Sequence, residues 1–123
     1  MKTLLLFLAC AGLALAEPRP VSLTGTLTNT TGDIAAPARL ELTRDGEKLS
    51  ARLVTLPPLT GTGELTGRWL DGWCELGGLL DGGFTVKFRG VWSARVFRGT
   101  YTARPERGPV QYGRFEFVPA VRQ

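Results

Sequence analysis

The stretch Phe84–Tyr101, with the sequence FTVKFRGVWSARVFRGTY, decides the fold of this chain. Apolar and polar residues alternate from Phe84 to Trp92, and the alternation starts again at Val96. A period of two is typical of a β-strand buried on one face, because successive side chains point to opposite faces. Ser93-Ala94-Arg95 interrupts the pattern, so the stretch predicts two strands joined by a turn.

Both predicted strands contain a glycine between two large apolar residues, with one spacer on each side. The repeats are Leu23-Gly25-Leu27, Leu65-Gly67-Trp69, Phe88-Gly90-Trp92 and Phe97-Gly99-Tyr101, with a shortened form at Gly113-Phe115. In every copy the glycine falls on the apolar face. A glycine at such a position lets the strand bend and lets an aromatic ring lie over its backbone. The repeat therefore predicts a strongly coiled sheet.

The rest of the sequence supplies further alternating segments separated by turn residues. Asp45-Gly46 lies between two such segments, which is a strong hairpin signal, and Asp71-Gly72 predicts a second tight turn. We expect a loop at Thr30–Pro37, and the glycine-rich segment Trp73–Leu80 predicts one strand or none. The other expected strands are Val21–Asn29, Ala38–Arg44, Glu47–Thr55, Gly61–Trp69, Phe84–Trp92, Val96–Arg104 and Tyr112–Val118.

About eight strands joined by short connections, with no helical period, predict an all-β antiparallel meander. An open sheet of this length would expose one apolar face and two edges, which closure removes. We therefore expect a small up-and-down barrel, with a two-sheet β-sandwich as the alternative. Aromatic and leucine residues share the face without charge, so they are expected inside and the charged face outside, as in a water-soluble barrel.

The first sixteen residues have the features of a cleaved signal peptide. Lys2 precedes an apolar segment, and Ala14-Leu15-Ala16 fits a small-x-small cleavage site. We therefore expect export to the periplasm or the medium, with residues 17–123 forming one domain. The alternative is a lipoprotein anchored at Cys10. Elsewhere the sequence contains no apolar segment long enough for a membrane-spanning helix.

Cys74 is the single cysteine that would remain after cleavage. A lone cysteine in an exported domain suggests a reactive thiol or an interchain disulfide, and the alternative is a small buried apolar residue. The lack of a second cysteine favours a bacterial envelope over a disulfide-rich secretory route. The net charge is +4, but the arginines are interleaved with glutamates along the sequence, so no nucleic-acid partner is expected.

Catalysis is not expected, because the chain contains no histidine. The commonest general base and the commonest zinc ligand are therefore missing, and one cysteine cannot form a thiolate metal site. No two acidic residues share the apolar face of a predicted strand, which excludes a carboxylate pair inside the barrel. We expect no cofactor and no bound metal.

The inward aromatic residues are the candidates for a binding site. An eight-stranded barrel is just wide enough to be filled by side chains or to hold one small ligand. Aromatic rings would contact the ligand and a few polar groups near strand ends, Asn29 and Thr55 among them, would orient it. The candidate lining residues are Asn29, Trp69, Phe88, Trp92, Phe97 and Tyr101.

Parts of the sequence resemble the strands of streptavidin-like barrels. Gly25-Thr26-Leu27-Thr28-Asn29 resembles their opening strand, and Leu65–Trp69 and Arg98–Tyr101 are similar to their Gly-x-aromatic strands. The same strand pattern occurs in lipocalin-like barrels. The resemblance implies a meander barrel. It does not imply biotin binding, because Leu27 stands where the family has tryptophan and only Asn29 matches a ligand-contacting position. The Gly-x-Trp of a lipocalin first strand is also absent at Leu27.

Two functions follow as expectations. The first is a non-catalytic structural or interaction module of the bacterial cell envelope, whose outer face of threonine and arginine would contact an envelope protein, the cell wall or an anionic lipid surface. The alternative is a carrier of a small apolar ligand inside an aromatic-lined lumen. A filled interior would favour the first function, and an open lumen would favour the second.

Overall fold

A computed structural model describes residues 19–120, so the predicted signal peptide and the Cys10 anchor lie outside the described residues. The described chain is all β. Its strands are β2 (Val21–Asn29), β3 (Ile34–Asp45), β4 (Lys48–Thr55), β5 (Thr62–Leu70), β6 (Trp73–Leu80), β7 (Phe84–Ser93), β8 (Val96–Arg104) and β9 (Gln111–Pro119).

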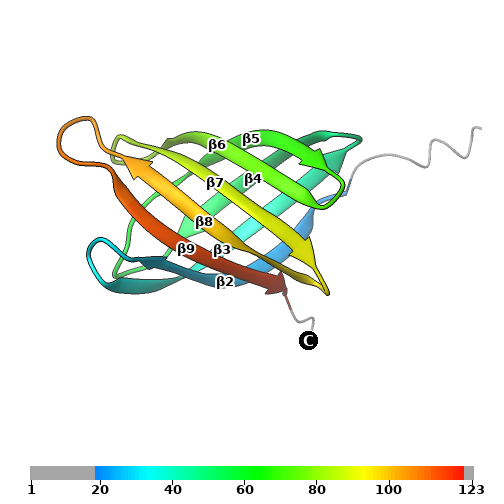
Figure 1. The fold of residues 1–123 in the computed structure, drawn as a ribbon, viewed down its shortest axis with the longest axis horizontal. Coiled ribbons are helices and arrows are strands. Elements are labelled where there is room, and N and C mark those ends of the chain that lie inside the picture. The colour runs from blue at the N-terminus through cyan, green and yellow to red at the C-terminus, as the bar shows by residue number, and fades with distance from the viewer. Residues whose placement is uncertain (1–18, 121–123) are drawn as a thin grey trace, which may run out of the picture.

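The eight strands form one closed antiparallel barrel in which each strand pairs with the next along the chain (Figure 1). β9 closes the barrel against β2, where Gly25 lies opposite Phe117. The predicted up-and-down barrel is thus confirmed, and the two-sheet sandwich is wrong. Closure pairs the first and last strands and leaves no free sheet edge.

Two segments are more regular than the sequence predicts. Trp73–Leu80 is a full strand, β6, paired with both β5 and β7 despite its glycines. The predicted loop Thr30–Pro37 is too long, because β3 already begins at Ile34. β3 tolerates Pro37 because the N–H that proline lacks would lie outside the strand pairing. The Pro37 carbonyl points to the side of β4, where it accepts a hydrogen bond from the Leu56 N–H at 3.0 Å, and the missing N–H would point to the same side. The last β3–β4 pair is Ala38 and Thr55, so Pro37 lies just beyond it.

The repeated glycines lie where the neighbouring strand leaves no room for a side chain. A methyl group on Gly67 would overlap the carbonyl oxygen of Glu75, and one on Gly99 would overlap that of Arg89. At Gly113 the ring of Tyr101 occupies the same space. The repeat therefore has a steric role in this barrel: it allows tight coiling and lets aromatic rings pack on bare backbone.

The inward side chains form a single core, and its aromatic members make a chain of contacts along β7, β8 and β9. Phe115 contacts Phe97 at a centroid distance of 4.8 Å and Phe88 at 5.3 Å, both edge to face. Phe88 in turn stacks on Tyr101 at 5.2 Å. Ring pairs with these geometries stabilise the core more than the burial of their apolar surface alone would.

The outward face carries charged pairs between neighbouring strands. Arg52 and Glu64 are register partners on β4 and β5 with an N–O distance of 2.8 Å, and Arg98 and Glu116 pair similarly at 3.3 Å. These pairs are exposed, so each contributes about 0–1 kcal/mol to stability. No helix suited to crossing a membrane is found among residues 19–120.

Candidate functional site

A cavity of about 140 Å³ lies inside one end of the barrel. This is the end at which β2, β4, β6 and β8 finish and where the loops at 30–33, 56–61, 81–83 and 105–110 connect the strands. Its apolar lining consists of Leu27, Leu53, Pro58, Leu59, Leu80, Phe84, Val86, Phe88 and Ala103. Its polar lining consists of Asn29, Thr55, Thr60, Tyr101 and Gln111. We call this end the open end and the opposite end the packed end.

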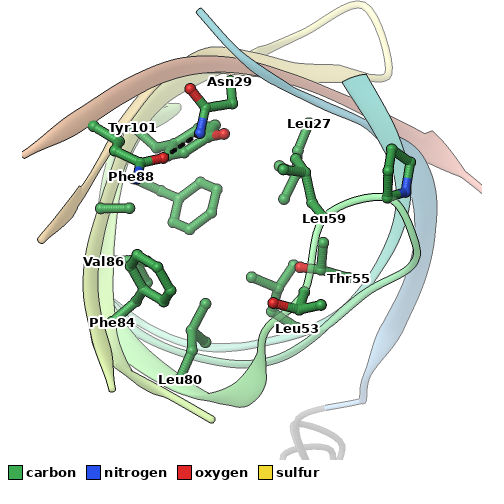
Figure 2. A pocket seen from close by; sticks show the side chains of 14 residues that line it. Leu27, Asn29, Leu53, Thr55, Leu59, Leu80, Phe84, Val86, Phe88 and Tyr101 are labelled. Carbon is green, nitrogen blue, oxygen red and sulfur yellow. Dashed lines mark hydrogen bonds between the residues drawn. The ribbon is translucent and has the colours of Figure 1, made fainter. Parts of the chain in front are cut away.

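The strand period explains the apolar walls. Phe84, Val86 and Phe88 are alternate residues of β7, so all three face inward and form one wall, and Leu53, Thr55 and Leu59 lie across from them (Figure 2). Phe88 and its register partner Tyr101 stack at an interplanar angle of 27°. Together these two side chains give the cavity one aromatic wall.

Asn29 and Gln111 form a polar pair at the rim. Asn29 ends β2 and Gln111 begins β9, and the Asn29 side-chain amide donates a hydrogen bond to Gln111 Oε1 (Figure 2). Asn29 Oδ1 accepts from the Gly32 N–H at 2.9 Å, which holds the β2–β3 connection against the rim. The two amide side chains therefore satisfy part of each other's hydrogen-bonding capacity inside the protein.

Thr55 differs from Asn29 and Gln111 in the hydrogen bonding of its side chain. It ends β4 on the inward face, following Leu49, Ala51 and Leu53, and 8% of its surface is exposed. Its backbone N–H donates to the Gly61 carbonyl at 3.0 Å, but its hydroxyl oxygen is buried without a hydrogen-bond partner. Thr55 is one of the residues that line the cavity, on the side across from Val86 and Phe84 (Figure 2). A buried hydroxyl without a partner is uncommon in folded proteins and calls for an explanation.

The β4–β5 loop covers one side of the cavity. Pro58, Leu59 and Thr60 contribute to the lining, and Leu59 packs, partly buried, against the core. The loop is attached to the barrel by the Thr55–Gly61 hydrogen bond and by the bond from Leu56 to Pro37. One wall of the cavity is therefore a loop that is fixed at its base and packs an apolar side chain against the core.

Within residues 19–120, no charged side chain lines the cavity. Among these residues Tyr101 is the one titratable lining residue, and burial raises the pKa of Tyr101 above its ordinary value. The phenol is therefore neutral over the physiological range and available as a hydrogen-bond donor. The cavity is an uncharged, largely apolar environment with a few polar groups, which is the composition expected of a small-molecule site.

Of the six predicted lining residues, the structure brings three together. Asn29, Phe88 and Tyr101 line the cavity, whereas Trp69, Trp92 and Phe97 lie toward the packed end. Their placement follows from strand position. Trp69 and Trp92 are near the ends of β5 and β7, which finish at the packed end, and Phe97 is the second residue of β8, which begins there.

These three aromatic residues help to fill and cover the packed end. Trp92 contacts Phe97 at a centroid distance of 6.0 Å, and Phe97 is almost fully buried. The Arg44 guanidinium lies over the Trp69 ring at 4.4 Å from its centroid. The inward aromatics therefore have two different environments, which the strand pattern alone does not separate.

Sequence reasoning did not select Gln111 or Leu59. Gln111 was outside the predicted last strand, Tyr112–Val118, and the structure begins β9 one residue earlier. Leu59 belongs to a loop, where periodicity gives no orientation. Thr55 carried a usable signal, because it is a hydroxyl residue at an inward position of an otherwise apolar strand face.

Cys74 lies in the packed half and is fully buried. Burial raises the pKa of the Cys74 thiol to about 11, opposed by the nearby Arg44 charge, which lowers it. A reactive or interchain thiol needs exposure and a thiolate. The placement of Cys74 therefore contradicts that interpretation and supports a small buried apolar residue.

Residues 19–120 contain no group of three or more histidine, cysteine, aspartate or glutamate residues placed to hold a metal ion. The expectation that the protein is not an enzyme remains a prediction.

In the comparisons with known proteins, the sequence matched no protein-family model and no curated protein.

Proposed function

We propose that this protein binds a small neutral molecule in the cavity at its open end. The observation that carries the proposal is an aromatic-walled cavity that contains a buried hydroxyl without a partner. Packed protein interiors have few voids larger than a water molecule, whereas this pocket, which opens to solvent at the barrel end, leaves about 140 Å³ unfilled. Of the two functions expected from the sequence, this proposal corresponds to the second, the carrier of a small apolar ligand.

The size of the cavity limits the ligand. Its volume of about 140 Å³ is close to the roughly 150 Å³ of an engineered apolar cavity that binds benzene. It is smaller than the roughly 300–1,000 Å³ typical of sites for drug-sized ligands. The proposed ligand therefore has about one six-membered ring enclosed by the barrel.

The lining limits the charge of the ligand. Because no charged side chain from the described part of the chain faces the cavity, an ionised ligand group would be buried without a counter-ion, at a large desolvation cost. Neutral ligands are therefore favoured over carboxylates or amines. The aromatic wall formed by Phe88 and Tyr101 suits a flat or ring-shaped molecule.

Methyl NMR with benzene as the probe tests this proposal. We expect chemical-shift changes at Leu27, Leu53 and Leu80, which line the cavity, and little change at Leu23 in the packed half. Tryptophan fluorescence is a poor readout, since Trp69 and Trp92 are not among the lining residues.

A filled variant provides the control. Ala103→Leu places a larger side chain in the cavity and should abolish the shifts, whereas Thr102→Leu alters an outer neighbour on β8 and should preserve them. Absence of any shift in the unaltered protein, or identical shifts in Ala103→Leu, would contradict the proposal.

A second function is favoured by the charge distribution on the outer face. Strands β7 to β9 carry a group of exposed basic residues, which we call the basic wall; its members are Lys87, Arg89, Arg98, Arg104 and Arg114. Arg89 and Arg98 have glutamate partners, whereas Lys87, Arg104 and Arg114 form no ion pair within residues 19–120. We propose that this wall contacts an anionic surface of the bacterial envelope, to which the leader segment would direct the chain.

Sedimentation with anionic lipid vesicles tests this second function. The double variant Lys87→Gln/Arg114→Gln should weaken binding, and the effect should fall as salt rises. Arg39→Gln/Lys48→Gln removes the same charge from exposed positions on β3 and β4 and serves as the matched control. Equal loss in both double variants would show a response to net charge alone and would refute the basic wall as a specific site.

A further inference from the structure

We infer that the ligand is a neutral ring bearing a hydroxyl or carbonyl group, and that Thr55 selects it through a hydrogen bond. This inference rests on the proposed function and names the chemical class of its ligand. It depends on a single atom, the Thr55 hydroxyl oxygen, which is buried and has no partner in the described chain.

The other buried polar group at this site has partners in the protein. Asn29 donates to Gln111 and accepts from Gly32, so its exclusion from water is compensated by hydrogen bonds. The Thr55 hydroxyl has no such compensation, although its backbone N–H is paired with Gly61. Valine, which has nearly the same shape, would avoid that cost. A hydroxyl kept at this position is explained if a ligand supplies its partner.

The barrel places Thr55 where its side chain can contact a substituent on the ring of a bound ligand. β4, which carries Thr55, and β8, which carries Tyr101, are separated by three strands on either side of the closed barrel and so face each other across the lumen. Figure 2 shows Thr55 on the opposite side of the cavity from Phe88. A ring that meets the aromatic wall edge-on would direct its far substituent, which lies in the ring plane, across the lumen toward the Thr55 hydroxyl.

The chemistry of a threonine hydroxyl defines that substituent. The hydroxyl both donates and accepts, so it can pair with a ligand hydroxyl or donate to a carbonyl oxygen. A ligand with only a methyl group at this point would leave it without a partner. Sites that provide a buried hydrogen-bonding group discriminate against analogues that lack the matching group.

Phenol and toluene form a suitable pair of probes, because they differ by a hydroxyl in place of a methyl group. We expect the unaltered protein to bind phenol at least about fivefold more tightly than toluene at neutral pH, corrected for the partition of each probe from water into an apolar solvent. Thr55→Val should remove this preference while retaining toluene binding. Titration calorimetry or the methyl shifts of Leu27 and Leu53 give both affinities.

Two further variants separate selection from structure. Thr100→Val makes the same change at an exposed threonine of β8 that does not line the cavity, and it should leave the preference unchanged. Thr55→Ser retains the hydroxyl and should retain the preference. Thr55→Val should also melt at a higher temperature than the unaltered protein without ligand, which shows that it is folded and that the hydroxyl is retained at a cost in stability.

The outcomes distinguish this inference from the proposed function. Loss of the phenol preference in Thr55→Val alone supports the inference. Equal corrected binding of phenol and toluene by the unaltered protein, or a preference that survives in Thr55→Val, overturns it and leaves the small-ligand site intact. Failure of both probes to bind the unaltered protein overturns the proposed function itself.

Discussion

The two halves of the barrel share the same eight strands but differ in how their interior is filled. In the packed half, Leu23, Phe97 and Phe117 are each about 1% exposed, and Arg44 and Trp69 stack at the end. In the open half, the inward positions at the strand ends include Thr55 and Ala103, and a cavity of about 140 Å³ remains. The difference shows that the size and polarity of a few residues at strand ends decide whether such a barrel is filled or hollow.

The largest expected contrast lies within β2. Leu23 and Leu27 face inward on either side of Gly25, but only Leu27 lines the cavity. Leu23→Ala should lower the free energy of unfolding by about 3–5 kcal/mol, because it leaves a new void in a packed region. Leu27→Ala should cost at least about 1 kcal/mol less, since part of that side chain already borders empty space. Urea unfolding measures both; equal costs would mean that the open half is packed as tightly as the other.

A pH-dependent contrast should follow from Cys74. Its folded pKa is about 11, above the ordinary value of 9.0, so the thiol contributes stability below pH 9 that is lost as the pH rises toward 11. Between pH 8 and 10.5 we expect a loss of about 1–2 kcal/mol from this group. Cys74→Ala should remove that part of the loss, leaving the contribution of Tyr101, whose pKa is raised in the same direction. Urea unfolding at both pH values tests this, and an unchanged slope in the variant would contradict it.

The open half should contain a position where loss of a polar group stabilises the fold. Thr55→Val should raise the free energy of unfolding by about 1 kcal/mol in the absence of ligand, because it removes a buried hydroxyl without a partner. The same change at Thr102, which is partly exposed on the outer face of β8, should have little effect on the core. A destabilised Thr55→Val would show that the hydroxyl is satisfied within the folded protein.

The smallest expected effect concerns the contact between Arg44 and Trp69 at the packed end. Arg44→Gln removes the cation that lies over Trp69 and should cost about 0.5–1 kcal/mol. It should also raise the pKa of Cys74 further, since Arg44 lowers that pKa. Arg39→Gln, at an exposed position on the same strand, is the control. Thermal melts and thiol titration measure the two effects, and identical behaviour of the two variants would argue against a specific contact.

The strands could be predicted from the sequence because alternation is a local property, and their closure could be predicted because an open sheet would expose one apolar face and two edges. Val21–Asn29 and Val96–Arg104 were predicted with their observed bounds. β6 was uncertain because Gly77 and Gly78 suggest a turn, although pairing on both sides holds them in a strand. The cavity could not be predicted, since it depends on which inward residues meet across the lumen. Phe97 and Phe88 have the same local pattern, yet one fills the core and the other lines a space.

The register of the closing strands determines where the chain enters and leaves the barrel. Leu23, near the start of β2, lies opposite Pro119, the last residue of β9, so both strands reach the packed end (Figure 1). A tether, partner domain or solid support joined directly before Val21 or after Pro119 would therefore attach at the end away from the cavity. Joining these two positions and cutting the chain at Asp45-Gly46 would also move the break without changing the strand order, which makes this barrel a candidate for circular permutation.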